Sequence, residues 1–567
     1  MSKMSKEVKE MQTTENSDTV TNFMGSKAYE LNPLETLKMI AASSIFGEPQ
    51  YYVDGKRSES WLKYSIEKMW FPFLVIIPEK SKTTAEIYED AIDKALDYDF
   101  EATIRFADEL RHNYMMRLNP QVIMVRAALH PKRADFNNAH PGLFKEIEMR
   151  VMSRADEPAT QLTYYLSLNK GNKANIPSIL KRSWAEKLES LTPYEVSKYK
   201  NHEIGMINTV RVCHASSDVL NELMKNGNVE LEADEKTWEN YKSEGKTWKE
   251  ILSLTRVPHM ALLRNLKNIA MSLDPADQES LSFMQDVLNT LEKGVLKGKQ
   301  FPFRYYSAYK RIKGMRDLNY KDLIIESLEN CLNISLENMP KLDGKTMVLT
   351  DNSGSAWGTL ETEFGSVLVA EINNLSAVLT ALNSTEGYIG VFGDELEVIK
   401  ADKNDKVLEL LEKVNRIGKN IGMGTETGSY TFFEKAIDNR EWYDNVFVYS
   451  DMQIGTGGLY GKGINEKEFF DKYNTDHTIK LSDHMSYEYI DLFALLKIYR
   501  SLVNSKANVF AIQTAGYKNT PFPGYAYRTT LLYGWTGKES VFAKAMIDNW
   551  DEFDKAHTVI PNVNEAL

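Results

Sequence analysis

Hydrophobic positions follow two different patterns along the chain. Through residues 32–338, apolar side chains recur every three or four positions, as at Leu34, Leu37 and Ile40, which places them on one face of a helix. Prolines fall between such segments, where they end one helix or begin the next. This part of the chain predicts an α-solenoid of antiparallel helix pairs. No clean sequence period is visible, so we expect any repeats to be diverged.

A second pattern begins at residue 341. Short apolar runs there alternate with helical stretches: the expected strands cover 346–350, 387–392, 445–450 and 507–513, and the expected helices cover 362–382, 404–417 and 486–505. This alternation predicts an α/β doubly wound domain with a parallel sheet over 341–567. We expect the Gly- and charge-rich stretch 453–485 to be a surface insertion and the polar residues 1–24 to be flexible, which leaves 25–340 for the helical module.

Composition places the chain among soluble multi-domain proteins. Its 567 residues, 43% of them hydrophobic and 26% charged, are too many for one core. The two cysteines, Cys213 and Cys331, are too few for a disulfide framework, which favours a reducing compartment. The first residues lack an apolar signal segment, and the apolar run 71–77 is too short to cross a bilayer. We therefore expect a cytoplasmic, monomeric protein with no membrane partner.

Negative charge is concentrated in the second part of the chain. Of a net charge of −12, residues 341–567 supply about −10, from about 22 basic and 32 acidic side chains. The overall acidity argues against nucleic acid as a partner. The helical part is close to neutral, however, and can still carry basic patches.

An oxygen-rich loop follows the first expected strand. Its sequence D-N-S-G-S, at 351–355, puts one carboxylate and two hydroxyls at the carboxyl edge of the sheet, where open α/β sheets bind ligands. The glycine-rich loop 422–427 and the end of the strand 445–450 should meet at the same edge. Oxygen ligands of this kind suit Mg²⁺. The sequence predicts a Mg²⁺ site formed by Asp351, Ser353, Ser355, Thr425 and Asp451.

Two other interpretations of this loop are open. The aspartate and serines could simply cap a helix, since both residue types are common at N-caps. An aspartyl phosphatase would need an acid two residues after the nucleophilic aspartate, and Ser353 stands at that position. No Ser-His-Asp, Cys-His or zinc-ligand spacing stands out elsewhere. We therefore expect a binding protein and not an enzyme, with a metal-dependent hydrolase as the weakest alternative.

The metal constellation resembles the metal-ion-dependent adhesion site of von Willebrand factor A domains, which are Rossmann-like, over residues 341 to about 555. The resemblance implies that Ser353 and Ser355 bind the cation directly and that Thr425 binds directly or through water. Asp351 and Asp451 would act largely through waters. One coordination position would stay open for a carboxylate from a partner.

Three stretches of the helical part combine cations with aromatic residues, at 105–154, 170–214 and 293–316. Cations attract phosphates, and aromatic rings or Arg planes can stack unpaired bases, so such stretches favour single-stranded RNA. The alternative is an ordinary solvated helix face whose aromatic residues belong to the core.

The segment P-H-M-A-L-L-R-N-L at 258–266 resembles part of the TROVE module of the Ro autoantigen family, and 196–200 with 210–214 resemble another part of it. The resemblance implies HEAT-like helical repeats closed into a ring that the A domain seals. Single-stranded RNA ends would enter the hole and duplex would lie on the basic outer face. The candidate RNA-binding residues are Lys173, Lys181, Arg182, Lys198, Lys200, His202, Arg211, His214, Arg264 and Arg304.

Two functions are compatible with these features. The first is a Ro-like protein that binds small noncoding, Y-like or misfolded RNA in RNA quality control, with an acidic protein or an exoribonuclease at its A domain. The second is a Mg²⁺-dependent scaffold that holds an acidic partner through the A domain and has little affinity for RNA.

Overall fold

The computed structural model describes most of the helical and sheet-forming parts of the chain. The described residues are 19–21, 27–30, 32–43, 84–113, 116–169, 173, 175–201, 204–231, 236–362, 365–422, 428–450, 452, 492–514, 519–523, 526–533 and 539–556. The predicted insertion at 453–485 and most of the predicted flexible N-terminus lie outside them. Within these ranges, no helix is long and apolar enough to cross a membrane.

The chain divides into two compact units. One contains Thr36–Tyr64 and Pro78–Leu262, and the other contains Met1–Glu35, Ser65–Ile77 and Leu263–Leu567. The division falls inside two helices, α2 (Pro33–Ser43) and α16 (His259–Met271). The last helices of the predicted helical module therefore belong to the same unit as the sheet, although the sequence pattern changes only at residue 341. The domain limits inferred from the sequence stay a prediction.

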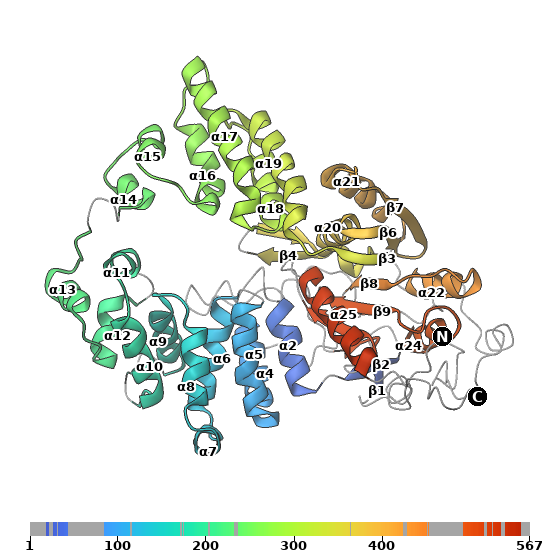
Figure 1. The fold of residues 1–567 in the computed structure, drawn as a ribbon, viewed down its shortest axis with the longest axis horizontal. Helices are drawn as coiled ribbons and strands as arrows, with labels where there is room; N and C mark the ends of the chain where they lie inside the picture. Colours follow the sequence, from blue (N-terminus) through green and yellow to red (C-terminus); the bar gives the residue numbers. More distant parts are fainter. Residues whose placement is uncertain are drawn as a thin grey trace, which may run out of the picture. The chain divides into compact units, whose positions relative to one another are not determined.

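The helical unit contains no strand among its described residues (Figure 1). Its helices are α4 (Thr84–Tyr98), α5 (Phe100–His112), α6 (Leu118–Leu129), α7 (Arg133–Ala139), α8 (Leu143–Val151), α9 (Glu157–Leu168), α10 (Ser178–Glu189), α11 (Pro193–Tyr199), α12 (Met206–Cys213), α13 (Asp218–Asn226), α14 (Trp238–Ser243) and α15 (Trp248–Leu254). One apolar core runs through the unit and includes the fully buried Phe144, Tyr164 and Trp184. The predicted helical character of this part is confirmed.

Local sequence signals set many of these helix ends. Between α4 and α5, Asp99 accepts a hydrogen bond from Ala102 N at 2.9 Å and caps α5. A capping box of Thr192 and Glu195, followed by Pro193 at the first helical position, starts α11. Ring closure of the helices stays a prediction.

The second unit is built around a six-stranded sheet of order β11-β9-β8-β3-β6-β7. Its strands are β3 (Leu342–Asp351), β6 (Ser384–Phe392), β7 (Leu396–Ala401), β8 (Asn445–Ser450), β9 (Asn508–Gln513) and β11 (Thr529–Tyr533). Every neighbouring pair is parallel except β6 and β7. The prediction of a parallel sheet is thus wrong at one edge, because the short connection between β6 and β7 permits only an antiparallel pair. The four predicted strands are confirmed, and β7 and β11 were missed.

Helices cover both faces of this sheet (Figure 1). They are α20 (Val369–Leu382), α21 (Val407–Gly418), α22 (Gly428–Asp438), α24 (Leu492–Leu502) and α25 (Glu539–Ala556). The core on one face joins Met347 and Leu349 to α22 and α24. Successive strand residues face opposite sides, and on the other face Tyr449 contacts α20 through Thr380 Oγ1 at 2.9 Å. The mixed α/β fold of this part is therefore confirmed in its doubly wound arrangement.

The helix predicted at 362–382 begins later than expected. An antiparallel hairpin of β4 (Thr359–Thr362) and β5 (Gly365–Leu368) occupies its first residues. The sequence E-T-E-F-G-S around this hairpin lacks helical periodicity, and the glycine favours a turn. The apolar residues that follow form α20.

Three further helices of the TROVE-like part, α17 (Gln278–Gly298), α18 (Pro302–Lys313) and α19 (Lys321–Ser335), share this unit with the sheet. Tyr306 and Lys310 of α18 both donate hydrogen bonds to Glu371 in the first turn of α20. In addition, Asn333 of α19 accepts a hydrogen bond from Val407 N at 3.0 Å and thereby caps α21. These contacts attach the three helices to the α/β fold.

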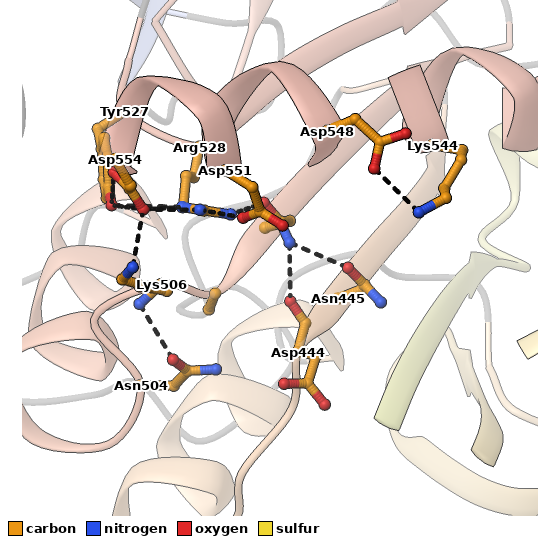
Figure 2. Close-up of polar contacts among 12 residues, drawn as sticks. Asp444, Asn445, Asn504, Lys506, Tyr527, Arg528, Lys544, Asp548, Asp551 and Asp554 are labelled. Carbon is orange, nitrogen blue, oxygen red and sulfur yellow. Dashed lines mark hydrogen bonds and ion pairs between the residues drawn. The ribbon is translucent and has the colours of Figure 1, made fainter. Parts of the chain in front are cut away.

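A cluster of polar contacts links α25 to the amino ends of β9 and β11 (Figure 2). The buried Arg528 donates to Asp554 at 2.7 Å and to Asn508 at 2.8 Å, and it also contacts Asp551. Tyr527 donates to Asp554 at 2.8 Å, and Lys506 lies 3.2 Å from the same carboxylate. Burial tends to raise the pKa of Asp554, but the bonds from Arg528 and Tyr527 hold it below its ordinary value.

A small separate sheet joins segments from the two ends of the second unit. Strand β2 (Lys27–Glu30) lies between β1 (Thr19–Thr21) and β10 (Asn519–Thr520) and is antiparallel to both. Residues 19–21, in the segment that we predict to be flexible, therefore form a strand.

Candidate functional site

The loop after β3 holds its acidic residue in a fixed position. Asp351 is fully buried, and its Oδ1 accepts a hydrogen bond from Ser353 N at 2.9 Å. Its Oδ2 accepts one from Ser450 Oγ, at the end of β8, at 2.5 Å. Hydrogen bonds from two different elements thus orient both carboxylate oxygens.

The two serines of the loop are spaced as neighbouring ligands of one cation. Ser353 Oγ and Ser355 Oγ lie 3.2 Å apart. Octahedral Mg²⁺ holds its oxygen ligands at about 2.1 Å, which separates adjacent ligands by about 3.0 Å. The described residues therefore fit a Mg²⁺ ion bound directly by two hydroxyls, with Asp351 beside them.

A network of hydrogen bonds between asparagine side chains supports the loop 351–355. Asn352 donates to Asn374 Oδ1 at 2.8 Å, and Asn374 in turn donates to Asn415 Oδ1 at 2.8 Å. The indole of Trp357 donates to Asn352 O at 2.9 Å. A Cβ at Gly418 would come within 2.0 Å of Asn352 Oδ1, so this position of α21 requires glycine. The sequence analysis missed this network because its members come from three separate elements.

Three of the five predicted metal ligands are described, and the structure brings them together: Asp351, Ser353 and Ser355. Thr425 and Asp451 lie outside the described residues. Ser450, which immediately precedes Asp451, contacts Asp351 and so places the end of β8 at the same edge as the loop.

The helical unit presents a ladder of cations and aromatic rings on and beside α11. Lys198 Nζ lies 5.6 Å from the ring centroid of Tyr199 and 5.4 Å from that of Tyr194, whose hydroxyl it contacts at 2.9 Å. On the other side, the guanidinium of Arg154 lies 5.1 Å from the Tyr199 ring. We call Arg154, Tyr194, Lys198 and Tyr199 the cation–aromatic ladder.

Neighbouring groups stabilise the charged forms of Lys198 and Arg154. Partial burial tends to lower the pKa of Lys198, but its bond to Tyr194 and the charge of Glu239, 3.6 Å away, raise the pKa overall. Arg154 is oriented by Asp156, whose two oxygens accept hydrogen bonds at 2.9 and 3.0 Å. The sequence analysis named Lys198 but not Tyr194, Tyr199 or Arg154, although each falls in a stretch that it singled out.

The other predicted RNA-binding residues fall into two groups. In the helical unit, Lys173, Arg182, Arg211 and His214 are exposed, whereas Lys181 and Lys200 are half-buried and Lys200 contacts Asn228. Arg264 and Arg304 are exposed but belong to the second unit. His202 lies outside the described residues.

The three tyrosines of the stretch 293–316 are not a stacking surface. Tyr305, Tyr306 and Tyr309 are buried, and Tyr306 is bonded to Glu371. Their spacing places them on the inner face of α18, while Lys310 and Arg311 are exposed and Lys310 is paired with Glu371. For this stretch the alternative of a solvated face over core aromatics is the one that the structure supports.

Comparisons with known proteins agree with this architecture. Residues 228–344 match the family model of the TROVE domain. Among curated protein sequences, none matches the chain. Among solved structures, the Deinococcus radiodurans Ro (RSR) protein superimposes with a TM-score of 0.54 at 12% identity, covering 81% of this chain and 94% of that one. The chain thus contains a TROVE segment and shares its fold with a Ro protein.

Proposed function

We propose that the chain is a Ro-like, non-catalytic RNA-binding protein that holds structured RNAs through their single-stranded ends, in noncoding-RNA quality control. The TROVE segment and the Ro fold support this proposal. The observation that carries it is the cation–aromatic ladder, in which two cations alternate with two tyrosine rings.

Such a ladder suits a single RNA strand. Lysine and arginine attract the phosphates, and an aromatic or guanidinium plane can stack an unpaired base whatever its identity. Additional exposed cations at Arg182 and Arg211 lie in the same unit. Because each phosphate contact releases counterions, the affinity should fall steeply as salt is added.

The test is binding of a fluorescent hairpin RNA with a single-stranded 3′ tail, measured by anisotropy between 50 and 200 mM salt. We expect the wild-type affinity to fall by at least about tenfold over this range. We also expect Lys198→Ala/Lys200→Ala to bind more weakly and with a shallower salt dependence. The matched control is Lys403→Ala/Lys419→Ala, which removes two exposed lysines of the α/β fold. Binding that is insensitive to salt, or equal in both double variants, would contradict the proposal.

A second function is supported by the pair of serine hydroxyls 3.2 Å apart. We propose that the loop 351–355 holds Mg²⁺ and that the cation offers an open position to a carboxylate of a protein partner. Asp351 would hold a metal-bound water, and Ser353 and Ser355 would bind directly. Calorimetric titration with Mg²⁺ should show one site that is lost in Asp351→Ala. An unchanged Mg²⁺ affinity in that variant would reject the site.

A further inference from the structure

Two buried oxygen atoms beside Asp351 have no hydrogen-bond partner among the residues that the structure describes. They are Asn373 Oδ1 and Thr514 Oγ1, in side chains that are 0% and 3% exposed. Buried polar atoms are nearly always hydrogen-bonded, so an exception next to a ligand-binding loop indicates a missing partner. Neither residue belongs to the predicted metal ligands.

Both residues are placed against the metal loop by their own backbone or side-chain contacts. Asn373, on α20, donates from Nδ2 to Asp351 O at 3.3 Å, which fixes its Oδ1 as the unpartnered atom. Thr514 follows β9 and donates from its main-chain N to Ser450 O at 3.0 Å. Ser450 in turn donates to Asp351 Oδ2. The two residues therefore approach Asp351 from two different elements, Asn373 by a direct bond to its main chain and Thr514 through Ser450.

The chemistry of these atoms defines the missing partner. An amide oxygen accepts hydrogen bonds or binds a cation, so the partner of Asn373 Oδ1 is a donor or a cation, and the hydroxyl of Thr514 can accept from the same kind of donor. An anion cannot serve the amide oxygen, and the cation itself is assigned to the serines in the site proposed above. Water can donate, and water bound to a divalent cation is the stronger donor because the metal polarises its O–H bonds. Mg²⁺ keeps several of its waters when proteins bind it.

We propose that Asn373 and Thr514 accept hydrogen bonds from water molecules coordinated to the cation of the loop 351–355. This inference rests on the metal site proposed above and extends it by two positioning residues. The serines hold the cation itself, and Asn373 and Thr514 hold its waters. The site therefore recognises a hydrated divalent cation, which favours Mg²⁺ over ions that shed their waters more readily.

Thr514 gives the cleaner test because valine matches its shape without the oxygen. We expect Thr514→Val to weaken Mg²⁺ binding by about tenfold in calorimetric titration of the full chain. Thr514→Ser, which restores the hydroxyl, should return the affinity to near the wild-type value. The matched control is Ser327→Ala, which removes another buried, unpartnered hydroxyl from α19. Its Mg²⁺ affinity should equal that of the wild type.

Asn373→Asp tests the second residue by an expected gain of Mg²⁺ affinity instead of a loss. The carboxylate keeps an acceptor for a metal-bound water and adds negative charge near the cation, so Mg²⁺ should bind more tightly. Without Mg²⁺ the variant should melt at a lower temperature, because a second buried carboxylate then lies beside Asp351. Added Mg²⁺ should raise the melting temperature of the variant by more than it raises that of the wild type.

The outcomes separate this inference from the metal site itself. If neither the wild type nor any variant binds Mg²⁺, the metal site is rejected and this inference with it. If the wild type binds Mg²⁺ and loses it in Asp351→Ala, while Thr514→Val and Asn373→Asp bind like the wild type, only this inference is overturned. A lower affinity in Thr514→Val that Thr514→Ser does not restore would also overturn it, as a packing effect.

Discussion

Two buried glutamates make the stability of the helical unit depend on pH. Glu148 of α8 is fully buried, and the side chain of Gln161 near it only partly offsets the loss of water. Burial, with a contribution from the charge of Glu157, raises the pKa of Glu148 to about 8. Burial also raises the pKa of Glu157 to about 7. At neutral pH the native state therefore keeps protons that the unfolded chain has lost.

The sign of this effect predicts a loss of stability with rising pH. The folded state binds more protons than the unfolded state between the ordinary pKa of 4.5 and about 8, so the free energy of unfolding should fall across this window. One proton contributes a slope of up to about 1.4 kcal/mol per pH unit. Glu148→Gln should flatten the slope in denaturant unfolding measured from pH 5 to 9. Glu146→Gln, an exposed neighbour on α8, should leave it unchanged.

The residue scale also shows which parts of the site a sequence reveals. Asp351, Ser353 and Ser355 could be predicted because five consecutive residues carry their chemistry and the strand before them fixes the edge. Asn373 and Thr514 could not be predicted, because their contacts with the loop depend on how α20 and β9 dock. The contact of Arg154 with the Tyr199 ring was missed for the same reason, because Arg154 comes from a different part of the chain.

At the scale of elements, α25 depends on one buried ion pair. Arg528 and Asp554 are 2% and 5% exposed, and Figure 2 shows them between the sheet and the helix, with Tyr527 and Lys506 on the same carboxylate. Removing one partner of a buried pair leaves the other charge without compensation. The polar attachment of the last turns of the helix therefore depends on this pair.

We expect Asp554→Asn to lower the free energy of unfolding by about 3 kcal/mol, measured by urea denaturation. The control on the same helix is Asp548→Asn, which breaks the ion pair with Lys544 at 2.9 Å, where Asp548 is 56% exposed. That exposed pair should contribute less than about 0.5 kcal/mol. Equal effects of the two substitutions would show that the buried cluster does not stabilise α25.

Elements with strong periodicity were predicted well, and edge elements were not. The buried strands β3, β8 and β9 have continuous apolar runs that only a covered sheet explains. In contrast, β7 has mostly exposed residues at one edge of the sheet, so its sequence carries little apolar signal. The hairpin of β4 and β5 directly precedes α20, and its residues from 362 onward were assigned to the helix.

At the scale of the whole molecule, the two proposed sites belong to different compact units. The cation–aromatic ladder lies in the helical unit, and the loop 351–355 lies in the unit that contains the sheet. The uneven net charge agrees with this separation of sites, since most of the net negative charge lies after residue 341, where basic side chains are fewer.

Separate sites predict separable losses. EDTA or Asp351→Ala should abolish the Mg²⁺-dependent capture of an acidic partner and leave the affinity for tailed hairpin RNA within about twofold, because no phosphate contact is removed. Lys198→Ala/Lys200→Ala should lower the affinity for the RNA and leave the Mg²⁺-dependent capture of the acidic partner unchanged. Anisotropy with RNA and calorimetry with Mg²⁺ on the same protein samples would check both halves. A large loss of RNA affinity on chelation would instead show that the two sites are coupled.

The small sheet of β1, β2 and β10 has a consequence for how the chain is made. Strand β2 is synthesised early, but its partner at Asn519 and Thr520 leaves the ribosome only after almost all of the chain. Until then one edge of β2 has free main-chain donors and acceptors, which can pair with another strand. Folding of the second unit therefore cannot be completed in the order of synthesis, and the nascent chain carries an open strand edge that a chaperone or a neighbouring chain can bind.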